Sequence, residues 1–154
     1  MQRYLHFYPL LLPVTLLILG YFHPITALNQ DLGRHLLTGK IIVQDLHVPT
    51  TNLFSYTYPD FPFINHHWLS EVIFHLVQSA SGYPGLFILS LLLIISAFSL
   101  VLFTAARTAK IIPLAFLAII YLRILFERTD LRPELLSFLF MALMNTVLYR
   151  FREK

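Results

Sequence analysis

Three polar residues at the start of one predicted helix have the types and spacing to do chemistry together. Asp31 stands in the first turn after a good N-cap, Asn29, and Arg34 and His35 follow three and four residues later, near the same face. A carboxylate beside a histidine and an arginine can act as a general base or help to bind a phosphate-bearing lipid. The competing interpretation is structural, with Asp31 capping the helix and Arg34 meeting lipid headgroups.

A second polar group follows on another predicted helix. His67, Glu71 and His75 stand at successive four-residue steps after the N-cap residue Asn65, and His66 adds a further nitrogen donor. Histidine and glutamate at this spacing can ligate a divalent cation. The pattern is not the H-E-x-x-H zinc signature, and polar helix faces commonly carry such residues. A metal site is therefore the minor hypothesis, and an ordinary polar face is its alternative.

Both groups lie in a large loop, Asn29–Gly85, which must hold two short helices to position them. The first is predicted to run from Asn29 to Gly39, a good C-terminal stop. Its apolar stripe, suited to lying on a membrane, consists of Leu32, Leu36 and Leu37. The second is predicted to run from about Asn65 to the break at Ser81–Gly85. Its apolar positions follow the pattern of an interfacial amphipathic helix: Leu69, Val72, Ile73, Leu76 and Val77. Between the two helices we expect turns around a short extended segment, Phe54–Thr57.

The composition is that of an integral membrane protein. Hydrophobic residues make up 57% and charged residues 12% of the chain, whereas soluble domains carry about a quarter charged residues. Four segments approach the roughly 20 apolar residues that cross a bilayer as a helix: Tyr4–Phe22, Leu86–Ala106, Ile111–Phe126 and Leu135–Tyr149. The absence of cysteine excludes disulfides, thiolate metal sites and cysteine nucleophiles. The predicted fold is an all-α membrane protein with about four transmembrane helices and one or two interfacial helices, forming a single module over residues 1–154.

The basic residues orient the predicted spans. They fall in three clusters, namely Arg3, then Arg107 and Lys110, then Arg150, Arg152 and Lys154. With four crossings all three clusters share one side, which the positive-inside rule makes cytoplasmic. The Asn29–Gly85 loop is then extracytoplasmic, and the net charge of +3 reflects topology rather than nucleic-acid binding. The alternative is that the first apolar stretch is a cleaved signal peptide with a poor cleavage site at Ile25–Ala27.

Several segments, in their order, resemble a known family. They are Asp31–Gly39 (DLGRHLLTG), Pro49–Thr57 (PTTNLFSYT), Asn65–Glu71 (NHHWLSE) and Arg132–Ser137 (RPELLS). The first three resemble the first extracytoplasmic loop of bacterial membrane glycosyltransferase-like proteins of the GT-C type, related to the protein mannosyltransferase and lipid A arabinosyltransferase group. The fourth resembles a later segment of such proteins, so the resemblance covers nearly the whole chain.

The resemblance implies a site and a reaction. Asp31 takes the position of the acidic residue that deprotonates or orients an acceptor hydroxyl while a sugar is transferred from a polyprenyl-phosphate donor. The residues that would line the same cavity, with a divalent cation near the donor phosphate, are Arg34, His35, His66, His67 and Glu71. Arg128 and Arg132 are further candidates for the phosphate, because a guanidinium can bind two of its oxygens at once. For Arg132 a role at the helix end, reaching toward the membrane interface, is the alternative.

The chain departs from that family in length. Enzymes of the GT-C type carry many more spans than four, so we expect this chain to supply only the amino-terminal part of the module. It would do so as part of a longer protein, as a non-catalytic small membrane subunit that needs a partner, or as the remnant of an enzyme that no longer catalyses. A divalent-metal-binding membrane protein is a third alternative. The expected location is the bacterial inner (cytoplasmic) membrane, with a cytoplasmic amino terminus. No glycine-rich phosphate loop is present, which favours a lipid-linked over a nucleotide-linked donor.

Overall fold

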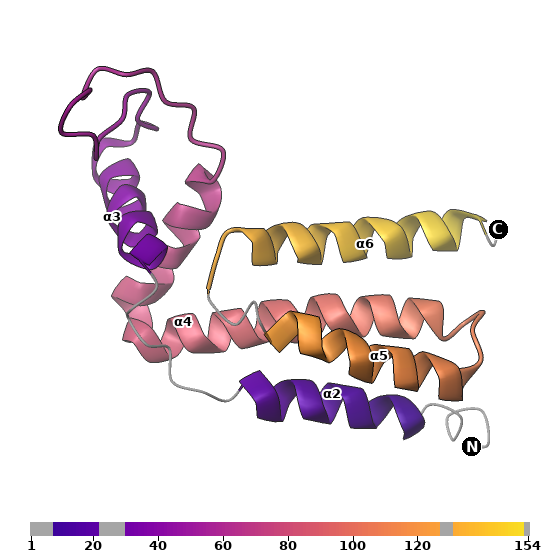
Figure 1. Cartoon of the computed structure of the whole chain (residues 1–154). Coiled ribbons are helices and arrows are strands. Elements are labelled where there is room, and N and C mark those ends of the chain that lie inside the picture. Colours follow the sequence, from indigo (N-terminus) through magenta and orange to yellow (C-terminus); the bar gives the residue numbers. More distant parts are fainter. Residues whose placement is uncertain (1–7, 22–29, 127–130, 153–154) are drawn as a thin grey trace. The chain divides into compact units, whose positions relative to one another are not determined.

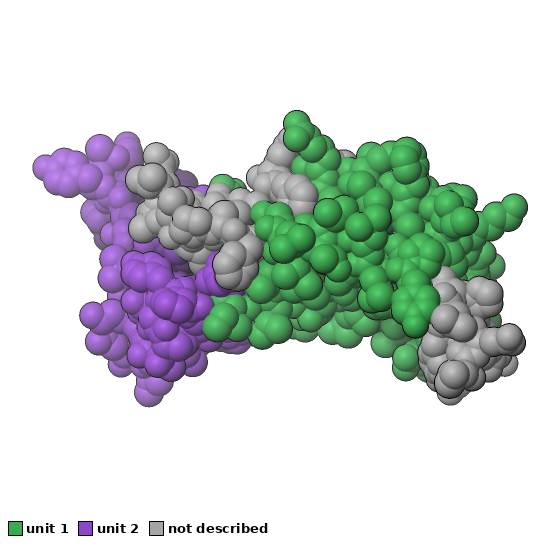
Figure 2. Space-filling model, turned by 90° about the horizontal axis from the view of Figure 1, so that it is seen from below, with its two compact units in different colours: residues 1–25, 88–154 green, residues 26–87 purple. Residues whose placement is uncertain are grey.

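The computed structural model describes residues 8–21, 30–126 and 131–152, and most of these residues are in helices (Figure 1). The helices are α2 (Tyr8–Tyr21), α3 (Gln30–Asp45), α4 (Trp68–Ala105), α5 (Ile111–Phe126) and α6 (Glu134–Arg152). Among the described residues there is no strand, only an isolated antiparallel bridge between Thr51 and Pro62. The all-helical prediction is therefore confirmed. Two compact units can be distinguished, unit 1 (Met1–Ile25 and Ile88–Lys154) and unit 2 (Thr26–Phe87), coloured separately in Figure 2.

Unit 1 consists of the apolar helices. Its core includes Leu10 and Leu17 of α2 and Leu122 of α5, and α2 packs along α5. Helix α5 has the predicted bounds, α6 contains the predicted segment 135–149, and the predicted segment 86–106 is the later part of α4, extended by one residue. By length and composition α4 and α6 can cross a membrane, while the apolar parts of α2 and α5 are shorter. The four crossings and their orientation stay predictions.

An apolar cavity of about 490 Å³ lies within unit 1, between α4, α5 and α6. Its lining includes Phe98 and Leu102 from α4, Tyr121 from α5, and Met141 and Asn145 from α6. The hydroxyl groups of Thr104 on α4 and Thr146 on α6 are hydrogen-bonded over 3.0 Å. None of the predicted site residues lines this cavity.

Unit 2 holds α3, the first part of α4 and the loop between them. The predicted stop at Gly39 is wrong, because α3 continues to Asp45. Gly39 serves close packing instead: a Cβ there would collide with the backbone carbonyl of Glu71 on α4. The helix ends where Leu46 takes a positive φ of 52°, a conformation that usually closes a helix at a glycine.

The second predicted helix of the loop is the first part of α4. It begins at Trp68, after Asn65 accepts the His67 backbone N–H at its Oδ1 over 2.9 Å. The predicted break at Ser81–Gly85 is present as a non-helical Gly82, with φ 65° and ψ −160°. Helix α4 therefore consists of two helical segments that meet in a kink at Gly82, the first being the predicted interfacial helix and the second containing the predicted span. Glycine suits this backbone, which other residues adopt only with strain.

The loop between α3 and α4 differs from the prediction in where it is extended. Phe54–Thr57, predicted to be extended, lies instead in the turns and bends in the middle of the loop. The paired backbone is on either side of it, where the Asn52 N–H donates to the Phe61 carbonyl over 3.0 Å and the Phe63 N–H to the Thr50 carbonyl over 2.8 Å.

Candidate functional site

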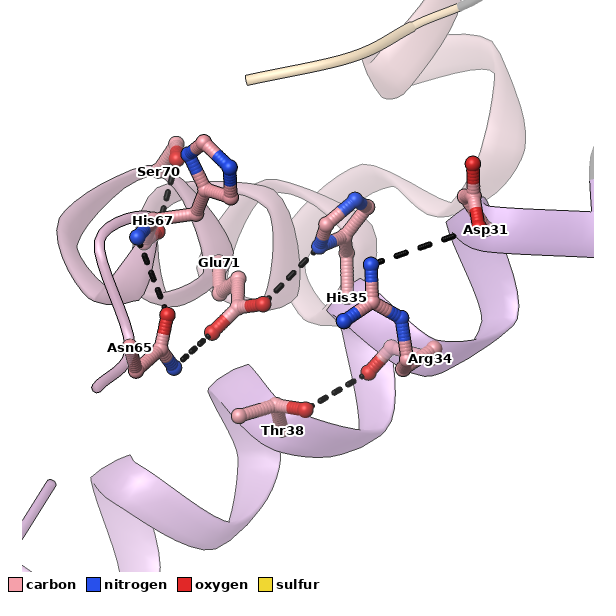
Figure 3. Close-up of polar contacts among 8 residues, drawn as sticks. All are labelled: Asp31, Arg34, His35, Thr38, Asn65, His67, Ser70 and Glu71. Atoms are coloured by element: carbon pink, nitrogen blue, oxygen red, sulfur yellow. Dashed lines mark hydrogen bonds and ion pairs between the residues drawn. The ribbon is translucent and has the colours of Figure 1, made fainter. Parts of the chain in front are cut away.

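The centre of the candidate site is a buried carboxylate held between α3 and α4 (Figure 3). His35 Nδ1 lies 2.8 Å from Oε1 of Glu71, and Asn65 Nδ2 donates to Oε2 over 2.5 Å. Both carboxylate oxygens therefore accept a hydrogen bond from a side chain. The side chains of His35 and Glu71 are only 4% and 3% exposed.

The protonation state of Glu71 follows from these bonds. Burial raises the pKa of its carboxyl, but the hydrogen bonds from His35 and Asn65 and the nearby charge of Arg34 lower that pKa by more. The pKa of Glu71 is thus below its ordinary value, and the group is a carboxylate at neutral pH. Because a carboxylate only accepts hydrogen bonds, His35 carries the donating proton on Nδ1.

Other polar side chains fix the two helix segments around this pair. The ring of His67 stands edge to face with that of His35, with centroids 6.1 Å apart and an interplanar angle of 89°. Ser70 Oγ donates to the His67 carbonyl over 2.7 Å. Thr38 Oγ1 donates to the Arg34 carbonyl over 2.9 Å. His67 is thus held at its backbone from two directions, by Asn65 and by Ser70.

Asp31 and Arg34 form the accessible part of the site. Their charged groups are 4.0 Å apart, and their side chains are 48% and 39% exposed. In Figure 3 they lie on the other side of His35 from Asn65 and His67. The three residues predicted to share one helix face are therefore divided. Asp31 pairs with Arg34, whereas His35 turns inward to Glu71.

The remaining predicted site residues are not gathered at this cluster. His66 is exposed on the turn before α4 and takes no part in the hydrogen bonds of Glu71. Arg132 belongs to unit 1, just before α6, and is partly exposed. Arg128 lies outside the described residues.

The metal-ligand set suggested by the sequence is not assembled. In the part of the chain that the structure describes, no group of three His, Asp or Glu side chains is placed to hold a metal ion. Glu71 faces α3, and its oxygens are occupied by His35 of α3 and by Asn65 of the turn before α4. Nε2 of His75 lies 3.4 Å from Ser79 Oγ, one turn further along the same helix.

Sequence reasoning missed Asn65 and Thr38 as members of the site. Asn65 was predicted to be an N-cap, which accounts for its carbonyl oxygen but not for the amide nitrogen on Glu71. The amphipathic pattern of this helix gave no signal for them. Of its predicted polar face only Glu71 is buried, while Leu69 and Leu76 of its predicted apolar stripe are each 51% exposed.

Comparisons of the chain with protein-family models, with curated proteins and with solved structures find no match.

Proposed function

We propose that this chain is a membrane glycosyltransferase of the GT-C type, or the amino-terminal part of one. It would transfer a sugar from a polyprenyl-phosphate donor to an extracytoplasmic acceptor. The observation that supports this best is the arrangement of two carboxylates with different surroundings. Glu71 is buried with both oxygens occupied, whereas Asp31 is nearly half exposed beside a guanidinium.

The different surroundings of the two carboxylates give Glu71 and Asp31 different roles in the proposal. Glu71 is a poor base, because its pKa is lowered and an acceptor hydroxyl cannot reach it past His35 and Asn65. Its role in the proposal is to position α3 by holding His35. Asp31, in the first turn of α3, is open to a substrate.

In the proposed reaction Asp31 takes the proton of the acceptor hydroxyl as its oxygen bonds to the anomeric carbon. The bond between that carbon and the donor phosphate oxygen breaks, and its electron pair leaves on the polyprenyl phosphate. Arg34, 4.0 Å from Asp31, stabilises the charge on the departing phosphate. A guanidinium suits this task because it can donate two parallel hydrogen bonds to phosphate oxygens.

The proposal includes four crossings of the bacterial inner membrane, by α2, the later part of α4, α5 and α6. Unit 2 would be extracytoplasmic. The positions of the basic residues support this orientation, because basic residues favour the cytoplasmic side. Arg107 and Lys110 lie in the connection between α4 and α5, and Arg150 and Arg152 lie in the last turn of α6. Because the chain has no cysteine, single cysteines at Lys40 of unit 2 and at Thr108 can be labelled selectively with a membrane-impermeant maleimide in intact cells. We expect labelling at residue 40 only, and labelling at residue 108 alone would show the opposite topology.

The activity test compares two aspartates of the same helix. Asp31→Asn and Asp45→Asn make the same chemical change at the two ends of α3. With the protein reconstituted in bilayers and a panel of polyprenyl-phosphate sugars, we expect Asp31→Asn to reduce transfer by on the order of 100-fold or more. Asp45→Asn should retain activity. Full transfer by a folded Asp31→Asn protein would remove Asp31 from the mechanism.

One observation favours a second candidate, a non-catalytic membrane subunit. Only 11% of the apolar span of α6 is buried, against 39% for α4. Asn145 is exposed on α6, and among the described residues its amide has no hydrogen-bond partner. An amide in a transmembrane helix commonly bonds to a neighbouring helix. If this reading holds, a membrane protein should co-purify with the wild type and with Asp31→Asn but not with Asn145→Leu, whereas Met144→Leu should retain it. A lone, active species would exclude it.

A further inference from the structure

The loop between α3 and α4 presents a group of large apolar side chains outward. We define the aromatic tip as the exposed members of this group between Thr51 and Pro62: Leu53, Phe54, Tyr56, Tyr58 and Phe61. Tyr56 is 100% exposed, Tyr58 70% and Phe61 61%. Apolar side chains gathered in this way on a surface usually mark a site of interaction.

The loop holds these side chains outward with its own hydrogen bonds. Asn52 Oδ1 accepts the Phe54 N–H over 3.2 Å, and Ser55 Oγ accepts the Tyr58 N–H over 3.0 Å. The Phe61 N–H donates to the Tyr58 carbonyl over 3.3 Å, and the bridge from Thr51 to Pro62 closes the base. These backbone N–H groups are therefore paired inside the loop. Their pairing lowers the cost of moving the loop into the interfacial region of a bilayer, where headgroups and water can bind its other polar groups.

The charge of the loop narrows the choice of partner. Residues 48–65 contain no lysine, arginine or histidine, and Asp60 is their single charged residue. The loop therefore offers no cation to phosphates or anionic lipids, and the contact it can make is apolar and aromatic. Tyrosine and phenylalanine side chains favour the boundary between the hydrocarbon and the headgroups of a bilayer.

We propose that the aromatic tip inserts into the interfacial region of the bilayer. The inference depends on the membrane insertion included in the proposed function. In the sequence, unit 2 is followed directly by the apolar span, which is the later part of α4 after the Gly82 break. The bilayer, rather than a second protein, is the occupant because the proposed spans bring unit 2 to a bilayer and the tip offers a protein partner no charged group except Asp60.

The test uses an environment-sensitive fluorophore on single cysteines in the full chain. Tyr56→Cys places the probe at the tip, Lys40→Cys on the exposed side of α3, and Leu92→Cys in the apolar part of α4. The three labelled proteins are reconstituted in phosphatidylcholine vesicles with and without brominated lipid. We expect the probes at residues 56 and 92 to shift to shorter wavelength and to be quenched by the brominated lipid. The probe at residue 40 should keep the emission it has in water.

The outcomes separate this proposal from the function on which it depends. Quenching at residue 92 with an aqueous signal at residue 56 overturns the insertion of the tip and leaves the spans standing. Aqueous signals at both positions overturn both. In the Tyr56→Cys protein, adding Phe54→Ser and Phe61→Ser should abolish the quenching at residue 56, whereas adding Thr57→Ser should not. Quenching that survives both serine substitutions would show that the aromatic side chains do not anchor the loop.

Discussion

His35 on α3 donates its Nδ1–H to Oε1 of Glu71 on α4 over 2.8 Å, and both side chains are almost fully buried. The two residues are 36 positions apart in the chain. Asn65 completes the group from the turn before α4. The pair fixes α3, the helix that carries Asp31, to the first part of α4.

Replacing Glu71 by alanine should lower the free energy of unfolding of unit 2. The substitution leaves the donors of His35 and Asn65 buried without an acceptor, which we expect to cost about 3 kcal/mol. The single tryptophan, Trp68, lies three residues before Glu71 and reports on unit 2 by its fluorescence during denaturation in detergent. His35→Ala combined with Glu71→Ala should cost less than the sum of the two single changes. Strict additivity would show that the pair does not couple the helices.

The stability of unit 2 should fall in acid. The pKa of Glu71 is lowered in the folded chain from an ordinary value of 4.5, so the unfolded chain binds the proton more readily. The contribution of Glu71 is therefore fully present above about pH 4.5 and is lost as the pH falls through the lowered folded value. The measurement is the denaturation midpoint from Trp68 fluorescence between pH 7 and pH 3, for the wild type and Glu71→Gln. The variant should show a smaller loss, and identical acid profiles would contradict the assignment.

Two glycines of α3 should respond in opposite directions to alanine. A Cβ at Gly39 would collide with the Glu71 carbonyl and press on His75, so Gly39→Ala should destabilise unit 2 by about 1–3 kcal/mol. A Cβ at Gly33 meets nothing within 4 Å, so Gly33→Ala should stabilise the helix by about 0.5–1 kcal/mol. Circular dichroism during thermal denaturation measures both. A tolerated Gly39→Ala would show that the helices do not approach each other so closely.

The end of α3 offers a stabilising substitution. Leu46 takes φ 52° and is 90% exposed, so its left-handed backbone is sterically strained and the burial of its side chain does not offset that strain. Leu46→Gly should stabilise unit 2 by about 1 kcal/mol, measured by the Trp68 denaturation midpoint. Leu46→Ala keeps a Cβ and is the matched control, for which little gain is expected. Equal gains in both variants would mean that backbone strain is not the cause.

The helices of unit 1 could be predicted closely from the sequence. The segment Ile111–Phe126 was predicted with the bounds that α5 has, although Arg123 interrupts its apolar run, because helical hydrogen bonds form between near neighbours in the sequence. The break in α4 was likewise visible in Ser81–Gly85, since glycine and proline act on the local backbone.

What the sequence by itself determined is the helical class, the apolar segments and the polar residues available for chemistry. Tertiary structure decided how those polar residues are used. The sequence pattern indicated a helix end at Gly39, whereas in the structure Gly39 allows α3 to pack against the backbone of Glu71. The spacing of Asp31 and His35 indicated one cluster, whereas the structure directs His35 to Glu71 on α4. The physical reason is range. Backbone hydrogen bonds and periodicity act over a few residues, whereas the burial of Glu71 depends on contacts with His35, 36 positions away, which no local pattern encodes.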